Sequence, residues 1–476
     1  MTPEHGSFRD ANNRVFYHDG EVFRSLSAEG AAHWRELSQT IFFTRLVESG
    51  AIIGTETETR PSIMALVSSQ WAAVLRHQRI PFISYPYEWT FGMLKDAALL
   101  HLTILEQALD NGWTLKDGSA YNIQWCGPRP VFIDVSSFEP YRPGDSWLGY
   151  RQFCMMFLIP LLLQAHRDIP LARCRSDLEG IDPAEALKLI STRDIFRRGV
   201  FTHIYLHARL QNRAARAEAR TPAPAAATAK WSIRQTREMT LRMVQSIKRL
   251  VEKLERKGGD TVWSAYEKTH SYDDASFDEK KAFVEKHVRS KRWSLVYDLG
   301  CNTGTFARLC GESADRVIAI DQDELAVDTL YRRLKPEKSG NITPLVMQLS
   351  NVSPDQGWRG RERKSFDSRA KPDLILGLAL IHHMVISANI PMQDFLEWLY
   401  GFGAAVILEF VGPDDEMTLR LLKNKRNQYP DYTQSRFESI ASSMFEIADA
   451  APLKEGRRRI YLLLPRTQPA QTETVT

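Results

Sequence analysis

Apolar runs and amphipathic stretches alternate along the C-terminal half of the chain. Each run is short enough to be a buried strand, and apolar residues at helical spacing separate most neighbouring runs. This alternation is typical of a doubly wound α/β sheet, in which helices connect successive parallel strands. The runs that predict strands are Leu295–Leu299, Arg316–Ile320, Pro344–Leu349, Asp373–Leu378, Ala404–Phe410 and Arg459–Leu464.

The N-terminal half has a mixed pattern, which predicts a separate α+β domain. A strand-like run, Ile80–Tyr85, precedes a long helical run, Met93–Gly112. A hairpin-like pair follows at Ile123–Trp125 and Pro130–Asp134, and from there to about residue 210 the pattern is mostly helical.

A change in composition separates the two halves. Residues 214–230, AARAEARTPAPAAATAK, offer no large apolar side chain to bury and predict an exposed linker. The next stretch, Trp231–Lys257, has apolar residues at helical spacing and is followed by Gly258 and Gly259, which favour the end of a helix. We therefore expect domains at 1–213 and 231–476.

Composition narrows the class of protein. The 476 residues are 43% hydrophobic, a content typical of a globular chain. The net charge of +4 is too small to indicate a nucleic-acid or membrane-surface partner. Five cysteines without a CxxC pair favour free thiols and argue against a structural zinc site. The longest apolar run, Phe153–Leu163, predicts a buried helix, because a membrane span needs about 20 residues. We expect a cytoplasmic protein of undetermined oligomeric state.

The strongest chemical signal is a strand that ends in an acid before a glycine-rich turn. The strand ends near Asp298, and the turn contains Gly300, Asn302 and Gly304. The two glycines let the backbone approach a ligand closely where a Cβ would collide. About 20 residues later a second apolar strand ends in Asp321, where nucleotide-binding units accept hydrogen bonds from ribose hydroxyls. A carboxylate at 298 would repel a pyrophosphate but suit a cationic amino group, so S-adenosylmethionine fits better than NAD.

These segments, DLGCNTGTF and VIAIDQD, resemble motif I and the second-strand acid of class I S-adenosylmethionine-dependent methyltransferases. Residues 373–383 resemble that family's fourth strand and the loop after it, and residues 405–410 resemble its fifth strand. The resemblance covers most of 231–465 and implies a Rossmann-like methyltransferase sheet that uses S-adenosylmethionine.

The resemblance also implies the cofactor site. The residues that it places there are Asp298, Gly300, Asn302, Gly304, Asp321, Gln348 and Leu349. Asp321 would hold the ribose, and Gln348 and Leu349 would flank the adenine. Position 348 departs from the family pattern, because many members have an acid there.

Candidate catalytic residues follow the fourth and fifth strands. Methyl transfer depends on positioning, and it needs a general base only where the acceptor must lose a proton. His382 and His383 lie where side chains reach the methyl edge of the cofactor, and histidine is the best-suited base near neutral pH. Either histidine is a candidate base, or one of them only packs under the next helix. Glu409 is a second candidate for contact with the acceptor.

The connection after the third strand has two interpretations. The turn-rich segment Asn351–Trp358 either closes the acceptor pocket or forms an ordinary surface loop. The basic run that follows, Arg359–Lys364, is expected to be a solvated loop rather than an RNA contact.

A second chemical pattern lies in the N-terminal half. Asp117, Asn122 and Asp134 have the residue types and spacings of a phosphoryl-transfer site: a carboxylate near the acceptor, a metal-binding Asn and a magnesium-chelating Asp. They resemble the catalytic loop and metal-binding Asp of the protein-kinase-like fold. The phosphate-covering G-x-G-x-x-G loop and a lysine of the V-A-I-K type are missing. We therefore expect a degenerate kinase-like domain; a working kinase using Mg-ATP, or coincidence, are the alternatives.

The order of the two halves resembles the bacterial host-specific nodulation-protein type methyltransferases over nearly the full chain. This resemblance implies methylation of a hydroxyl on a small molecule or glycan precursor. The alternatives are an RNA or protein methyltransferase, a bifunctional kinase–methyltransferase, and a scaffold that binds the cofactor without turnover.

Overall fold

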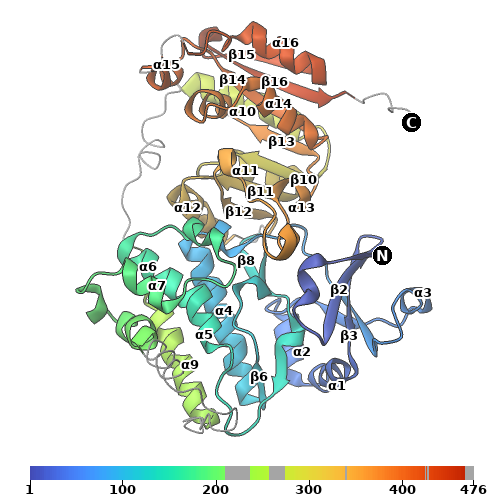
Figure 1. The fold of residues 1–476 in the computed structure, drawn as a ribbon. Coiled ribbons are helices and arrows are strands. Elements are labelled where there is room, and N and C mark those ends of the chain that lie inside the picture. The colour runs from blue at the N-terminus through green and yellow to red at the C-terminus, as the bar shows by residue number, and fades with distance from the viewer. Residues whose placement is uncertain (210–235, 257–273, 338–339, 424, 426–427, 467–476) are drawn as a thin grey trace. The chain divides into compact units, whose positions relative to one another are not determined.

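The computed structural model describes residues 1–209, 236–256, 274–337, 340–423, 425 and 428–466 (Figure 1). The chain divides into two compact units, and each is described by itself. The first unit comprises Met1–Gly259 and Asp355–Arg363, and the second comprises Asp260–Pro354 and Lys364–Thr476. The predicted linker at 214–230 and the pair Gly258 and Gly259 lie outside the described residues.

The first unit begins with an antiparallel five-stranded sheet in the order β1-β2-β3-β5-β4. Its elements are β1 (Thr2–Pro3), β2 (Asn13–His18), β3 (Glu21–Leu26), α1 (Ala28–Leu37), α2 (Ile41–Glu48), β4 (Thr55–Thr57), α3 (Pro61–Met64) and β5 (Ala73–His77). The predicted strand Ile80–Tyr85 is wrong, because the last strand of this sheet already ends at His77. The backbone amides of Ser84 and Tyr85 donate to the side chains of Gln124 and Glu88, both at 2.9 Å, instead of to a neighbouring strand.

The rest of the first unit is mostly helical. Its elements are α4 (Phe91–Asp110), β6 (Trp113–Leu115), β7 (Ile123–Cys126), β8 (Arg129–Phe132), β9 (Phe138–Pro140), α5 (Tyr150–Phe153), the π-helix η5 (Cys154–Leu158), α6 (Ile159–Arg167), α7 (Pro183–Leu189), the π-helix η8 (Phe201–Leu206) and α9 (Arg237–Glu252). The predicted long helix and hairpin are confirmed as α4 and as the antiparallel pair β7–β8. The apolar run Phe153–Leu163 is buried, as predicted.

The position of α9 corrects the predicted domain boundary at residue 231. The helix packs against α4 within the first unit, and its side chains Val244, Ile247 and Val251 are buried (Figure 1). Lys248 Nζ lies 2.9 Å from Glu106 Oε2 on α4. Because its apolar face is covered by α4, this helix belongs to the first unit rather than to the second.

The second unit is built on a seven-stranded sheet in the order β12-β11-β10-β13-β14-β16-β15. The five strands from β12 to β14 are parallel, whereas β16 is antiparallel to both β14 and β15. The strands are β10 (Trp293–Leu299), β11 (Ala314–Asp321), β12 (Ile342–Val346), β13 (Leu374–Gly377), β14 (Ala405–Val411), β15 (Phe445–Leu453) and β16 (Arg458–Pro465). The predicted doubly wound sheet and its six predicted strands are confirmed.

Sequence analysis missed β15, which lies at the edge of this sheet. Only its first and last residues, Phe445 and Leu453, are buried, so it carries no apolar run. The helices of the second unit are α10 (Asp274–Val288), α11 (Thr305–Ser313), α12 (Glu324–Leu334), α13 (Phe366–Arg369), the π-helix η12 (His383–Ser387), α14 (Met392–Gly401), α15 (Glu416–Leu422) and α16 (Gln434–Met444). Among the described helices of the whole chain, none combines the length and apolar content needed to cross a membrane.

Candidate functional site

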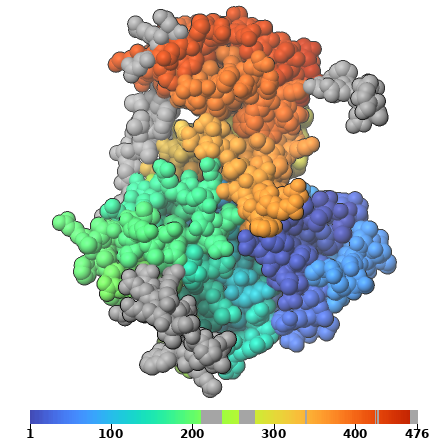
Figure 2. Space-filling model, viewed as in Figure 1, coloured from blue at the N-terminus to red at the C-terminus, as the bar shows by residue number. Residues whose placement is uncertain are grey.

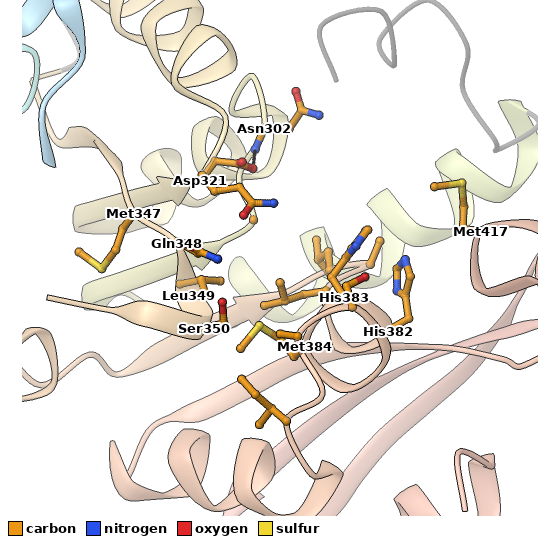
Figure 3. Close-up of a pocket in the computed structure, with 18 of the residues that line it drawn as sticks. Asn302, Asp321, Met347, Gln348, Leu349, Ser350, His382, His383, Met384 and Met417 are labelled. Atoms are coloured by element: carbon orange, nitrogen blue, oxygen red, sulfur yellow. Dashed lines mark hydrogen bonds between the residues drawn. The ribbon is translucent and has the colours of Figure 1, made fainter. Parts of the chain in front are cut away.

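A cavity of about 540 Å³ lies in the second unit, at the carboxyl ends of its parallel strands. Ligands of open α/β sheets bind at this edge, because the strand ends and the loops after them meet there. Figure 3 shows Asn302, Asp321 and Gln348 on one side of the cavity and His382 and His383 on the other. The described lining residues are Gly300, Asn302, Asp321, Gln322, Met347, Gln348, Leu349, Ser350, Leu378, Ala379, Leu380, His382, His383, Met384, Ser387, Ala388, Ile390, Met417 and Arg458.

The turn after β10 is held in place by Asp321 at the end of β11. Asp321 Oδ2 accepts from the backbone amide of Asn302, and its Oδ1 accepts from the amide of Asp323, both at 2.9 Å. Gly300 (φ +82°) and Asn302 (φ +49°) adopt left-handed backbone conformations, which glycine and asparagine accommodate most easily. The two residue types at these positions therefore allow the tight turn that borders the cavity.

Buried acceptor atoms lie at this turn without partners. Asp298 Oδ2 and Asn302 Oδ1 are both buried, and neither finds a hydrogen-bond partner among the described residues. Burial, reinforced by the nearby charge of Asp321, raises the pKa of Asp298 to about 7. Burial also raises the pKa of Asp321. These acceptors suit a ligand that donates hydrogen bonds and carries positive charge.

Two of the residues that the resemblance placed at the cofactor are not among the described lining residues. Asp298 lies behind the turn and is only 2% exposed. Gly304 serves packing, since a Cβ there would lie 2.4 Å from Leu330 Cδ1. The other five residues, Gly300, Asn302, Asp321, Gln348 and Leu349, border the cavity.

The opposite side of the cavity is formed by the segment after β13. Ala379 has φ +50°, a strained conformation for a residue with a Cβ, and the chain then enters the π-helix η12. Both features concentrate at functional sites. They bring His382 and His383 to the cavity, with ring centroids 4.2 Å apart.

Both histidines are neutral at physiological pH. Burial, with smaller contributions from His383 and Arg458, lowers the pKa of His382 to about 3. Burial also lowers the pKa of His383. His382 Nδ1 is buried without a hydrogen-bond partner among the described residues. A neutral imidazole can accept a proton, so both side chains are in the form that a general base requires.

Glu409 is not where the prediction placed it. Its side chain is fully buried, lies 2.7 Å from Lys280 Nζ and 3.2 Å from Arg458 Nη1, and is not among the described lining residues. Arg458, which does line the cavity, is also bound by both carboxylate oxygens of Asp415, at 2.8 and 3.0 Å. Burial alone would raise the pKa of Asp415, but its hydrogen bonds to Arg458 hold it at about 2. Glu409 thus contacts Arg458, which lines the cavity, but does not itself border it.

Sequence reasoning missed several lining residues. Met347 and Gln322 directly adjoin predicted ones, so their position after a strand was a usable signal. Arg458 and Met417 come from β16 and α15, which the chain reaches long after the recognisable motifs. Nothing in their local sequence indicates a site, since the sheet order alone brings them there.

In the first unit the structure brings Asp117, Asn122 and Asp134 close together. Asp134 Oδ1 lies 2.7 Å from Arg24 Nη1 on β3, and its two oxygens accept from Ser136 Oγ at 2.6 Å and Ser137 Oγ at 2.8 Å. Asn122 Nδ2 donates to the same Ser137 hydroxyl at 3.2 Å. Burial, assisted by the charge of Asp134, raises the pKa of Asp117 to about 6.

The whole chain is similar to one curated protein at a level that defines a family. It is 33% identical to nodulation protein NoeA of Rhizobium meliloti (strain 1021) over 458 residues, which are 96% of this chain and 94% of that protein. No protein-family model matches the chain.

Solved structures with similar folds include methyltransferases. The N-methyltransferase NodS from Bradyrhizobium japonicum WM9, solved with S-adenosyl-L-homocysteine, is 12% identical, with a TM-score of 0.32 over 44% of this chain and 100% of NodS. A SAM-dependent methyltransferase from Aquifex aeolicus is 16% identical, with a TM-score of 0.29 over 43% of this chain and 100% of that one. In the second unit of this chain, the parallel strands and the cavity at their carboxyl ends agree with the Rossmann-like sheet that the motifs imply. The protein therefore belongs to the family of nodulation protein NoeA, and its second unit has the fold of an S-adenosylmethionine-dependent methyltransferase.

Proposed function

We propose that this protein transfers a methyl group from S-adenosylmethionine to a hydroxyl oxygen of a small molecule, a class that includes glycan precursors. One observation carries the proposal: a single cavity has acceptor groups for a cationic cofactor on one side and two neutral histidines on the other. The cofactor supplies an electrophilic methyl group on a sulfonium. The side chains of the protein bind the cofactor and accept the proton of the acceptor hydroxyl.

The residues at the glycine turn fit this cofactor. Asn302 Oδ1, at the edge of the cavity, is a buried acceptor that a cationic amino group can satisfy, and the carboxyl of Asp298 lies behind the same turn and can attract that charge. Asp321 presents a carboxylate at the edge where ribose hydroxyls are held in nucleotide-binding sheets. Leu349 and Met347 offer apolar surface beside Gln348, whose amide can hydrogen-bond to a base. These side chains therefore match the charge and the hydrogen-bonding groups of S-adenosylmethionine.

We assign the general base to His383. Catalytic efficiency is highest when the pKa of the base lies near the working pH, and a pKa of about 3 makes His382 a weak base. His383 is less buried and also faces the cavity. In this proposal His383 accepts the proton of the acceptor hydroxyl, while His382 only lines the cavity beside it.

Substitution of Asp321 tests the cofactor site. We expect Asp321→Ala to weaken binding of S-adenosylhomocysteine about 100-fold, since hydrogen bonds to a charged group contribute about 1.5–3 kcal/mol each. The loss also removes the two backbone contacts that shape the turn. Isothermal titration calorimetry measures the effect. Asp315→Ala, at the other, exposed end of β11, is the matched control and should bind normally. Equal affinity of both variants would refute the site.

The pKa of Asp298 predicts a pH dependence. Below about pH 7 this buried carboxyl is protonated and neutral, and above it the carboxylate attracts a cationic amino group. Affinity for the cofactor should therefore rise as the pH increases through 7, and Asp298→Asn should remove the rise. Titrations at a series of pH values between 6 and 8 measure it. A pH dependence that is identical in wild type and Asp298→Asn would contradict the assignment.

The class of acceptor is tested by transfer of labelled methyl groups into a cell extract that is then fractionated by size. Label in the small-molecule fraction is expected. Label confined to RNA or protein would replace the proposal with the macromolecular alternatives, and no label in any fraction would favour a scaffold that binds the cofactor without turnover.

We further propose that the first unit is a kinase-like domain without phosphoryl-transfer activity. The helices α1 and α2 between β3 and β4, followed by the pairs β6–β9 and β7–β8, support the kinase-like interpretation. In kinases a lysine on the third strand contacts the nucleotide phosphates. Here the third strand, β3, carries Arg24, which binds Asp134 directly. The carboxylate of Asp134, which is expected to chelate magnesium, is therefore already neutralised.

Two substitutions test this interpretation of the first unit. We expect Asp117→Ala to leave methyl transfer nearly unchanged. Asp134→Ala should cost about 3 kcal/mol of stability, because it removes the partner of the largely buried Arg24. Thermal melts with and without Mg-ATP provide the measurement, with the exposed Asp110→Ala as control. A rise of several degrees with Mg-ATP that is lost in Asp134→Ala, together with ATP turnover that needs Asp117, would instead identify a bifunctional kinase–methyltransferase.

A further inference from the structure

The first unit contains a second cavity, of about 440 Å³, which the proposed methyl transfer does not use. It lies beside the loop after β6 and includes residues of the segment Asp355–Arg363, which belongs to this unit although it follows β12 in sequence. Figure 2 shows orange atoms of this part of the chain against the dark blue N-terminal residues. The described lining residues are Arg9, Ser119, Tyr121, Leu148, Arg151, Gln152, Met155, Met156, Leu178, Glu179, Glu362 and Arg363.

Three arginines and two carboxylates, Glu179 and Glu362, line this cavity. Arg9 donates to both oxygens of Glu362, at 2.6 and 3.1 Å, and Arg151 pairs with Asp182 at 3.0 Å. Arg363 is the third arginine, and its Nη2 lies 4.0 Å from the Glu362 oxygen that Arg9 already binds. The side chain of Arg363 is 20% exposed, and its Nε is buried without a hydrogen-bond partner among the described residues.

The guanidinium of Arg363 is held in a fixed position. It lies 4.1 Å from the centroid of the Tyr121 ring, on which it stacks. The backbone of Arg363 is paired with Gln356 through hydrogen bonds of 2.9 and 3.1 Å, and Gln356 is itself bound to Tyr87 and to the carbonyl of Arg175. A charged donor that is already immobilised loses little entropy when it binds an anion.

Part of the cavity lining is apolar. Met155, Met156 and Leu178 line it, and a smaller recess of about 30 Å³ shares Tyr121, Met156 and Leu178 with it. The recess is closed by further apolar side chains, among them Leu94, Pro160 and Leu171. A molecule bound here would therefore contact both apolar side chains and the Arg363 cation.

We infer that this cavity binds a small organic anion, in which a compact apolar body carries one phosphate or carboxylate group. The anionic group pairs with Arg363, and the apolar body contacts Met155, Met156 and Leu178. Charge-assisted hydrogen bonds to guanidinium are about twice as strong as neutral ones, which makes Arg363 the main determinant of affinity.

Calorimetric titration of the full chain with phenyl phosphate and with phenylacetate tests the inference and separates the two anionic groups. We expect saturable binding of at least one anion, at least tenfold weaker binding of phenol, and a loss of about tenfold or more in Arg363→Gln. Arg363→Lys keeps the charge and should retain more affinity than Arg363→Gln. Arg361→Gln, an exposed arginine of the same segment, is the matched control and should bind as wild type does.

A second variant guards against a folding defect in Arg363→Gln. Leu178→Asp places a carboxylate beside the apolar surface and should also weaken binding, while thermal melts of both variants report whether they fold. No saturable binding of either anion, binding that both variants leave unchanged, or equal affinity for phenol would overturn the inference.

Discussion

Replacing Arg458 with methionine is expected to lower the free energy of unfolding of the second unit by about 3–5 kcal/mol. The guanidinium is 1% exposed and binds Glu409 and Asp415, which are themselves fully buried. Without it, the two carboxylates lose a shared cation, although Glu409 keeps Lys280 at 2.7 Å and Asp415 keeps Lys454 at 3.2 Å and the amide of Met417 at 2.9 Å. Burying a carboxylate with an incomplete set of partners is costly, so the folded state loses more than the unfolded one.

Urea denaturation measures this loss, and the transition of the second unit is identified as the one that S-adenosylhomocysteine moves to higher urea. Arg459→Met is the matched control. Arg459 is the next residue of β16, is 38% exposed and lies 3.9 Å from Glu438, so its removal should change stability by less than about 0.5 kcal/mol. A variant at position 458 that is as stable as the one at 459 would show that the buried ion pairs do not hold β14 and β16 together.

Replacing His383 with glutamine is expected to lower kcat by about 10²–10³, with the affinity for S-adenosylhomocysteine unchanged. The imidazole is the group that we propose takes the proton of the acceptor, and glutamine keeps its hydrogen-bonding capacity without its basicity. Steady-state kinetics at saturating cofactor, with an acceptor fraction identified by the labelling experiment, provide the measurement. His382→Gln is the matched control and should reduce kcat by less than about tenfold, because His382 has a pKa of about 3.

The pH profile of kcat distinguishes a general base from a residue that only lines the cavity. Burial lowers the pKa of His383 from its ordinary value of 6.5, so the neutral, proton-accepting form persists to lower pH. In wild type, titration of His383 should therefore leave kcat independent of pH above pH 6.5 and lower kcat at more acidic pH. His383→Gln should lose this decrease at acidic pH, the acid limb of the profile. A larger effect of His382→Gln, or an acid limb that survives in His383→Gln, would transfer the role to another group.

The cofactor side of the cavity could largely be predicted from the sequence. The turn Gly300–Gly304 and the acid Asp321 are separated by one helix, and the geometry of a strand–turn–helix–strand unit is local. Predicted contacts at Gly300, Asn302, Asp321, Gln348 and Leu349 are all lining residues. A Cβ at position 304 would also meet Leu330, a packing neighbour that no local pattern reveals.

The acceptor side could not be predicted to the same depth. His382 and His383 follow a recognisable strand, but which of them is fit to act as a base depends on burial and on Arg458, which comes from the far end of the chain. Glu409 looked like an acceptor contact because it is an acid in a strand beside the site. The antiparallel pairing of β14 with β16 instead brings Arg458 to it, and α10 brings Lys280.

The first unit shows the same division between local and tertiary information. The sequence by itself indicated that Asn122 and Asp134 lie close together, because a short hairpin joins them, with Asp117 a few residues before it. Only the tertiary structure decided that Arg24 neutralises Asp134 and that Arg363, from a segment beyond β12, reaches Tyr121. Local periodicity and turn chemistry act over one or two elements, so sequence specifies the elements and nearby motifs. Charge pairing and burial depend on residues that are brought together only when the whole chain has folded.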